Sequence, residues 1–229
     1  MADIDLGANY IPRIQSAREM GIVFDTLQEF SQLQTWRNTS AAHWEEVAEL
    51  ILPTSRNTFY YGNFNWPGVK KTDRQVDASG MMALHRFAAI CDSLLTPRNS
   101  TWHQLAANNE YVMKDRASRL WFDKETKLLF EYRYAAMANF SSQNQNNFQG
   151  LGAFGTLGMF IDEFDHSTGG GRGIRYRSIP LGELFIRENH QGLVDGFIRW
   201  FRLTARQAVQ KWGEASLPEV LLPAYRMQS

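Results

Sequence analysis

The chain has 229 residues, of which 44% are hydrophobic and 21% are charged, a composition that fits a folded globular protein and excludes disordered and collagen-like classes. Its 24 basic and 24 acidic side chains give a formal net charge of +0, so no bulk attraction to nucleic acid or to an anionic membrane is expected. Cys91 is the only cysteine, which excludes an intramolecular disulfide and a cysteine-rich metal cluster. We find neither a signal peptide nor a membrane-spanning apolar run, and therefore expect synthesis in the cytosol.

The first quarter of the chain is predicted to be helical. Between residues 14 and 33 apolar residues recur at steps of three and four, which places one apolar stripe along a helix. Residues 38–40 are Asn, Thr and Ser, which favour helix caps. A second, separate helix is therefore predicted over residues 43–52, and it should stop at Pro53.

Two more helices are predicted in the middle of the chain. Asp77 or Ser79 can cap the first of them, which runs to Pro97. Its predicted core stripe consists of Leu84, Phe87, Ala88, Cys91, Leu94 and Leu95. Asp115 opens the other helix, whose apolar positions continue past Phe140.

Three shorter segments lie between and beyond these helices. Residues 54–76 are rich in aromatic, Asn and Gly residues without steady periodicity, which predicts an extended arm. Residues 101–105 alternate between polar and apolar side chains and are predicted to form a short strand. The polar residues 141–147 are interpreted as a solvated helix face or a loop.

Beyond Gly155 the pattern changes to strands. Four segments separated by turn-forming residues are predicted to be strands, namely residues 156–164, 173–179, 184–188 and 193–203. Thr204 then caps a two-turn helix that ends at Gly213. Helices first and strands later, without β-α-β alternation, predict an α+β fold whose strands form an antiparallel β-meander.

These predictions divide the chain into five parts. They are N-terminal helices (1–53), the aromatic-rich arm (54–76), a helical part (77–155), the antiparallel β-meander with its closing helix (156–213) and a tail (214–229). The tail is apolar and has no closing element, so we expect the chain to continue beyond it.

The aromatic residues suggest a contact between copies of the chain. Aromatic residues make up 13% of the chain, and several fall where the core of one domain reaches them poorly. They are Trp36, Trp212 and the arm residues Phe59, Tyr60, Tyr61, Phe64 and Trp66. Aromatic side chains concentrate at protein interfaces, so the arm residues are candidate inter-subunit contacts.

A local basic face is predicted on the strands. Arg175 and Arg177 alternate with residues of the opposite strand face and therefore share one side. Arg172, Arg199 and Arg202 could extend this side. Such a face could contact DNA weakly, or it could be solvated or form salt bridges with a neighbouring subunit.

No catalytic, cofactor-binding or metal-binding residue is assigned. Gly150, Gly152 and Gly155 form a G-x-G-x-x-G pattern, but a strand follows it where a nucleotide site needs a helix, so a turn is favoured. Gly169–Gly171 with Arg172 is interpreted as a hairpin tip rather than a phosphate loop.

Other reactive residues also lack a catalytic pattern. Asp162 and Glu163 point to opposite faces of a strand, and with Asp165 they are interpreted as strand-end charges. The five histidines, His43, His85, His103, His166 and His190, have no metal-ligand spacing. Cys91 is predicted to be a buried, inert thiol.

Several short motifs follow one another in a set order along the chain. They are Trp44 to Pro53, Asp77-Ala-Ser-Gly80, Leu95-Thr-Pro97 and Trp102-His-Gln-Leu105. This order resembles the head-to-tail connecting, or portal, proteins of short-tailed bacteriophages, in which a Trp-containing helix ends in Pro, a helix begins with Asp-x-x-Gly and ends in Leu-Thr-Pro, and a Trp-containing strand follows. The family usually has Phe where this chain has His103.

The second half of the chain continues the resemblance. A glycine turn leads into a strand, and a Pro-x-x-Glu step, a Gly-x-Val-Asp turn and an Arg-x-Phe-x-x-Thr-Ala-x-Gln run follow. They are Phe154-Gly-Thr-Leu-Gly158, Ile179-Pro-Leu-Gly-Glu183, Gly192-Leu-Val-Asp195 and Arg199 to Gln207.

The resemblance implies a structural component of the virion that corresponds to the wing region of a portal ring. In the family, twelve subunits form a ring at one capsid vertex for DNA packaging, DNA ejection and tail attachment. Implied partners are other copies of the chain, the major capsid protein, tail adaptor or head-tail connector proteins, the terminase, scaffolding or internal core proteins, and double-stranded DNA bound without sequence preference. Members are longer than this chain, with stem, clip and crown parts that have no counterpart here.

Two alternatives remain open at this point. One is a phage nucleotide-binding enzyme built around Gly150–Gly155, and the other is a tail adaptor protein. Under the portal interpretation no cofactor, metal or membrane is involved, and the protein resides in the host cytoplasm during assembly and then at the capsid vertex.

Overall fold

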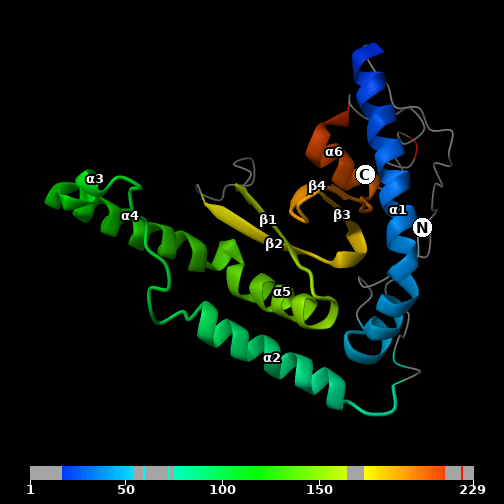
Figure 1. Cartoon of the computed structure of the whole chain (residues 1–229), viewed down its shortest axis with the longest axis horizontal. Coiled ribbons are helices and arrows are strands. Elements are labelled where there is room, and N and C mark those ends of the chain that lie inside the picture. Colours follow the sequence, from blue (N-terminus) through cyan, green and yellow to red (C-terminus); the bar gives the residue numbers. More distant parts are fainter. Residues whose placement is uncertain are drawn as a thin grey trace. The chain divides into compact units, whose positions relative to one another are not determined.

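The computed structural model describes residues 17–53, 59, 72, 75–163, 173–214 and 223, and these fall into two compact units (Figure 1). Unit 1 contains the chain up to Trp36 and from Phe185 onward, and unit 2 contains Arg37–Leu184. The elements in chain order are α1 (Ala17–Ile51), α2 (Ser79–Leu95), α3 (Glu110–Lys114), α4 (Arg116–Tyr134), η1 (Ala136–Ala138), α5 (Phe140–Phe154), β1 (Gly158–Glu163), β2 (Ile174–Ile179), η3 (Leu181–Glu183), β3 (Leu184–Glu188), β4 (Val194–Arg199) and α6 (Ala205–Trp212). The predicted α+β fold is confirmed.

Helix α1 is one continuous helix, so the prediction of two helices separated at residues 38–40 is wrong. Asn, Thr and Ser favour caps, but in a helix interior each costs at most about 0.7 kcal/mol relative to Ala. Leu33 before these residues and Ala41 after them are both buried, in the cores of units 1 and 2 respectively. Burial on both sides therefore outweighs the weak tendency to end the helix.

Unit 1 packs the β3–β4 hairpin against the N-terminal part of α1. Phe30 and Leu33 of α1 are buried with Phe185, and the Phe30 and Phe185 rings meet edge to face with centroids 4.8 Å apart. Arg187 bridges the two elements, since its Nη1 lies 2.6 Å from Glu29 Oε1 and its Nε lies 2.9 Å from Asp195 Oδ1.

The short helix that follows β4 in unit 1 forms as predicted. The Thr204 side chain accepts a hydrogen bond from Gln207 N, and the Gln207 side chain accepts one from Thr204 N, which is a complete capping box at the start of α6. Gly213 ends this helix with φ of 81°, a conformation that favours glycine.

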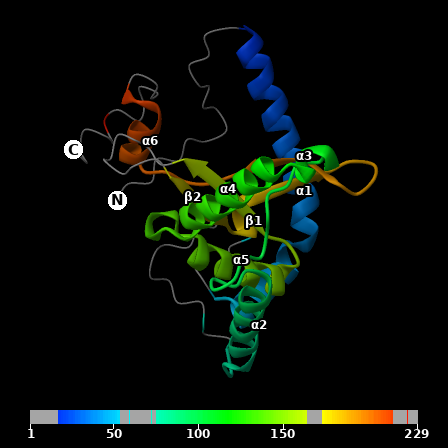
Figure 2. The ribbon, with the colours of Figure 1, turned by 90° about the vertical axis from the view of Figure 1, so that its left-hand side faces the viewer.

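Unit 2 is layered, with α5 lying between α2 and the β1–β2 hairpin (Figures 1 and 2). The hairpin is antiparallel and pairs Gly158 with Ile179 at one end and Glu163 with Ile174 at the other. On the far side of α5, a Cβ atom at Gly152 would lie 2.8 Å from both Leu84 Cδ1 and Phe87 Cδ1. Glycine is therefore what allows α2 and α5 to pack so closely.

The four strands pair as two separate hairpins, β1 with β2 and β3 with β4, rather than as one continuous meander. Their positions agree with the predicted segments to within a few residues. The 3₁₀ turn η3 separates β2 from β3, and β3 then enters the other unit. Sequence alternation locates strands well, but it does not specify which strands pair.

Three local predictions for unit 2 are wrong. Residues 101–105 form no strand, because the Leu105 amide donates to Thr126 Oγ1 on α4 instead of to a neighbouring strand. Residues 141–147 are neither a loop nor a fully solvated face, since they lie in α5 and Asn144 and Asn147 are buried. Cys91 is half-buried rather than fully buried.

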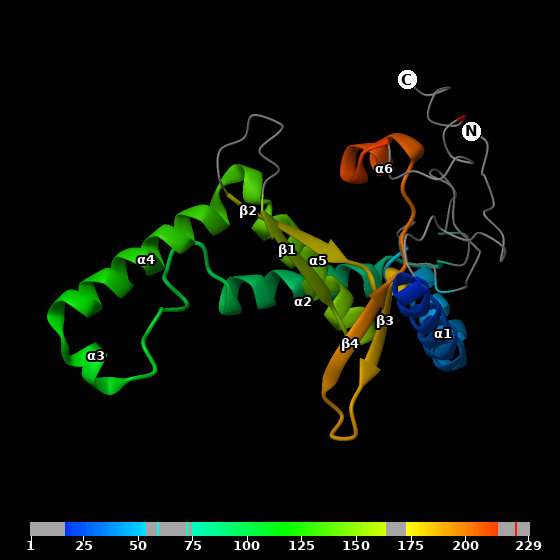
Figure 3. The ribbon, with the colours of Figure 1, turned by 90° about the horizontal axis from the view of Figure 1, so that it is seen from above.

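Helices α3 and α4 project beyond the layered part of unit 2 (Figure 3). Helix α3 was not predicted, and it starts where the Asn109 side chain accepts a hydrogen bond from Tyr111 N. Asp115 opens α4 as predicted, accepting a hydrogen bond from Ser118 N. This bond from the Ser118 backbone is the main reason why the pKa of Asp115 lies below its usual range.

Candidate interaction surfaces

A buried polar joint holds the ends of α2, α4 and α5 together. Asn144 Nδ2 donates to Asp92 Oδ1 and to Thr96 Oγ1, at 3.1 and 2.9 Å. The Tyr134 hydroxyl donates to the Thr96 carbonyl at 3.1 Å and accepts from Trp102 Nε1 at 3.0 Å. The Leu-Thr-Pro and Trp motifs of the sequence therefore serve the structure, because their polar atoms tie three helices at one point.

An aromatic cluster around Arg133 extends this joint. The Arg133 guanidinium lies 4.7 Å from the centre of the Trp102 ring, and its Nε lies 3.3 Å from the Tyr176 hydroxyl. Arg133 Nη1 is 3.1 Å from His103 Nδ1, and the His103 ring stacks on Phe130 with centroids 4.6 Å apart. Burial first, and the positive charge of Arg133 second, lower the pKa of His103, which is therefore neutral at pH 7.

The amide side chains of α5 satisfy polar groups on β2. Gln143 Oε1 accepts a hydrogen bond from Ser178 N, and Asn147 Oδ1 accepts one from Ser178 Oγ. The polar run in the sequence thus covers a strand edge that would otherwise expose an unpaired amide.

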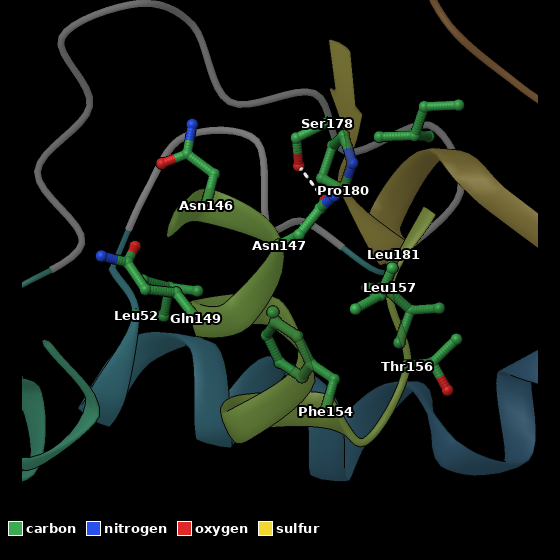
Figure 4. Close-up of a pocket in the computed structure, with 12 residues that line it drawn as sticks. Leu52, Asn146, Asn147, Gln149, Phe154, Thr156, Leu157, Ser178, Pro180 and Leu181 are labelled. Carbon is green, nitrogen blue, oxygen red and sulfur yellow. Dashed lines mark hydrogen bonds between the residues drawn. The ribbon is translucent and has the colours of Figure 1, made fainter. Parts of the chain in front are cut away.

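A cavity of about 150 Å³ lies beside this contact, between α5 and the end of β2 (Figure 4). Leu52, Phe154 and Leu181 form part of its wall. Asn147 also lines it, and within the described residues the buried Asn147 Nδ2 has no hydrogen-bond partner. The cavity is roomy enough for ordered water, which is the usual partner of such a group.

The G-x-G-x-x-G pattern occupies the C-terminal end of α5, so the sequence-based expectation of a turn is only partly right. Gly150 and Gly152 are helical, and only Gly155, with φ of 74°, forms the turn into β1. A helix C-terminus presents carbonyl oxygens and the negative end of the helix dipole. This geometry repels phosphate, so it does not support the nucleotide-binding alternative.

Two of the five candidate arginines lie together on the outer face of the β1–β2 hairpin. Arg175 and Arg177 are exposed there, opposite Asp162 and Phe160 of β1. Arg199 and Arg202 belong to unit 1, and Arg172 lies outside the described residues. Within unit 2, the described part of the predicted basic face is therefore a pair of arginines with a carboxylate opposite one of them.

The aromatic arm is described at one of its five candidate residues. Phe59 is only 3% exposed and packs against Trp44 and Phe154 within unit 2, so its predicted role as an inter-subunit contact is not supported. Tyr60, Tyr61, Phe64 and Trp66 lie outside the described residues. Trp36 and Trp212, in contrast, are exposed as expected.

A half-buried arginine packs against the Phe59 core. Arg37 Nη2 donates to the Gly182 carbonyl at 2.9 Å, and its guanidinium lies 5.4 Å from the centre of the Phe59 ring. Burial lowers the pKa of Arg37 to about 10, which still leaves it charged at neutral pH.

The remaining reactive residues form no site within the described ranges. Asp162 and Glu163 are exposed near the end of β1 as predicted, whereas Asp165, His166 and Gly169–Gly171 lie outside the described residues. In the described ranges no group of three or more His, Cys, Asp or Glu side chains could hold a metal ion. Among the described helices, none is both long and apolar enough to cross a membrane.

Large apolar side chains instead remain exposed on two helices of unit 2. On α2 they include Phe87, Ile90 and Leu94, and on α4 they include Trp121, Leu128 and Tyr132. Among the described residues, no large side chain is less than 2% exposed. Exposed apolar patches of this kind mark contacts with other proteins.

Phe87 and Leu94 were predicted to be core residues, and no interaction surface was predicted on α2. The signal was present, because the apolar residues of α2 cover two adjacent arcs of the helix. One arc, with Leu84 and Ala88, is buried. The second arc is additional apolar surface that a helix with a single packing partner does not need.

Similarity to known proteins identifies the family of this chain. Residues 25–229 match the family described as bacteriophage head to tail connecting protein, and the chain belongs to that family. It is similar to the probable portal protein of Bordetella phage BPP-1, with 26% identity over 189 residues, and to the portal protein of Salmonella phage epsilon15, with 27% identity over 194 residues. Each match covers 82% of this chain and 32% of the relative, so the chain spans about a third of the length of the curated relatives it matches.

Proposed function

We propose that the chain is the N-terminal part of a portal subunit, a virion protein that forms a closed ring at one capsid vertex. Twelve copies would form the ring, through which DNA is packaged and ejected and to which the tail attaches. The observation that carries the proposal is the family match over residues 25–229, together with large apolar side chains left exposed on two helices. Its role is structural rather than catalytic, and it uses no cofactor.

The parts of the chain then take the following roles. Residues 77–155 form the helical part of the wing, and residues 156–213 complete it with the two hairpins and α6. The proposed partners are the major capsid protein, tail adaptor or connector proteins, scaffolding or internal core proteins, and the terminase for a limited time. Assembly takes place in the host cytoplasm, and the finished ring remains in the virion. A tail adaptor role is less well supported, because both relatives described above are named as portal proteins.

We propose that DNA is contacted weakly and without sequence preference. The formal net charge of +0 gives no bulk attraction, and Arg175 lies opposite Asp162 rather than in a purely basic cluster. Each neutralised phosphate strengthens binding through counterion release, so a strongly basic channel would hold the genome instead of passing it. Sub-micromolar, sequence-specific binding at physiological salt would contradict this.

We propose that the arm contacts the next subunit through Tyr60, Tyr61, Phe64 and Trp66. Phe59 is left out of this proposal, because it packs in the core of unit 2. Since deletion of the whole arm would remove Phe59, the sharper variant changes the four other aromatic residues to Ser and keeps Phe59.

Native mass spectrometry of the protein expressed from its whole reading frame tests the proposal. We expect a closed ring for the parent protein and weaker assembly for the variant with four serines. A control with Phe59→Ala should lose stability through its unit 2 core and not specifically through the arm contact. A parent protein that stays monomeric at high concentration would show that the proposed ring is wrong.

A further inference from the structure

Helices α2 and α4 carry residues with the same spacing on a solvent-facing side. The α2 seam consists of Ala83, Phe87, Ile90 and Leu94, and the α4 seam consists of Trp121, Glu125, Leu128 and Tyr132. In both seams the steps between residues are four, three and four, which aligns the side chains along one line of the helix. Helices pair in coiled coils through this pattern, and each seam is about 16 Å long.

Phe87 of the α2 seam touches α5 beside Gly152, but the large apolar side chains of both seams remain 38% or more exposed. Helix α2 buries Leu84 and Ala88, which lie on a different arc, against the rest of unit 2. Helix α4 buries Thr126, which lies on the side of the helix away from the α4 seam. In the seams themselves, Leu94 is 74% exposed and Trp121 is 56% exposed.

The two seams differ in charge. Glu125 is the only charged residue in the α4 seam and has Lys124 beside it, whereas Arg86 is the only cation on α2 and adjoins Phe87 of the α2 seam. Within the described residues, no hydrogen bond or ion pair is formed by the side chain of either Arg86 or Glu125. A carboxylate that becomes covered in an apolar contact needs a cation beside it, because burial of an unpaired charge is costly.

The charges disfavour contact between two α2 seams, which would bring the Arg86 residues together. Two α4 seams could pair Glu125 with Lys124, but a contact between like surfaces closes a dimer and not a ring. An α2 seam against an α4 seam brings opposite charges together, and both apolar lines are covered. Such a contact joins two different surfaces, so it can propagate from copy to copy and close into a ring.

We propose that the α2 seam of one copy packs against the α4 seam of the next copy, with Arg86 beside Glu125. The occupant of each seam is thus a second copy of this chain. The proposal rests on the proposed function, since it assigns the surfaces through which the ring subunits meet. It is independent of the contact made by the aromatic arm.

Cysteine cross-linking of the full protein tests this pairing. Cys91 is the only cysteine in the sequence, so Cys91→Ala provides a clean parent if no further cysteine lies beyond these residues. Ile90→Cys and Leu128→Cys are then introduced alone and together. These positions lie near the middle of each seam, so they meet whether the two helices pair in parallel or antiparallel orientation. A short bismaleimide cross-linker is added, and native mass spectrometry of untreated samples shows whether the ring has formed.

We expect the double variant to give a ladder of covalent multimers and each single variant to give none. Covalent dimers from a single variant would show that like seams pair, which overturns the proposal. An intact ring without a ladder would overturn the seam pairing but leave the proposed ring in place. If the unaltered protein forms a ring but the Cys91→Ala parent does not, Ile90→Cys and Leu128→Cys are introduced into the unaltered protein instead. If neither the unaltered protein nor the Cys91→Ala parent forms a ring, the proposed ring is wrong as well.

Discussion

The two sides of α2 differ in what covers them, although both are apolar. Leu84 is 6% exposed because α5 packs on it, with Gly152 providing the room. Leu94, ten residues further along the same helix, is 74% exposed. The buried side holds unit 2 together, and the exposed side is available for a neighbouring molecule. Helical periodicity alone reveals that a side is apolar, but not which molecule covers it.

The largest expected effect separates these two sides directly. Leu84→Ala should lower the free energy of unfolding by about 2–5 kcal/mol, because it removes buried methyl groups and leaves a cavity. Leu94→Ala should change it by less than about 0.5 kcal/mol in the monomer, since its side chain is already in water. Urea denaturation followed by circular dichroism, at a concentration where the chain is monomeric, measures both. Similar losses for the two variants would contradict the distinction.

A second prediction concerns the buried polar joint. Asn144→Ala removes the donor to Asp92 and Thr96 and should lower the free energy of unfolding by about 1–3 kcal/mol, because two hydrogen bonds of a partly buried network are lost. Asn146→Ala, two residues further along and exposed, is the matched control and should stay within about 0.5 kcal/mol of the parent. Equal stability of the Asn144→Ala and parent proteins would mean that the joint contributes little.

A smaller effect is expected at His103 as the pH falls. Folding lowers the pKa of His103, so below about pH 6.5 the unfolded chain binds a proton more readily than the folded chain does. The contribution of His103 to stability is therefore complete above that pH and is lost as the pH decreases. His103→Phe keeps an aromatic ring but has no proton to bind, so its thermal unfolding temperature should fall less than that of the parent between pH 7 and pH 5. Parallel profiles for the two proteins would contradict this.

The smallest expected effect is at the edge of the seams. Arg86→Glu or Glu125→Arg alone should weaken ring assembly, because each brings like charges together. A pair of this kind at a partly exposed site is worth about 0.2–1 kcal/mol per contact. The double charge exchange should recover assembly, as measured by the ring fraction at low protein concentration in native mass spectrometry. Independent, additive losses in the double variant would show that the two residues do not meet.

Much of the fold was predictable because it depends on local signals. The strands, the capping box at Thr204 and Gln207, and the start of α4 at Asp115 follow from residue types that act over three or four positions. Helix α1 continues without a break through residues 38–40 because residues before and after them are buried, and the local sequence does not show this burial. The absence of a strand at residues 101–105 likewise depends on Thr126, which is distant in sequence.

The candidate surfaces were less predictable for a physical reason. Phe59 looked like an exposed aromatic residue of an arm, yet it fills the core beside Trp44 and Phe154. Phe87 and Leu94 looked like core residues, yet they are exposed on α2. Buried and interface positions share the same apolar composition, so only the arrangement of the surrounding elements distinguishes them.

Electron cryo-microscopy of the ring formed by the complete protein tests the central claim most directly. The account predicts that α2 of each copy lies against α4 of the next copy, with Phe87, Ile90 and Leu94 covered and Arg86 beside Glu125. A ring in which both seams face solvent, or in which copies meet α2 to α2 or α4 to α4, would contradict it.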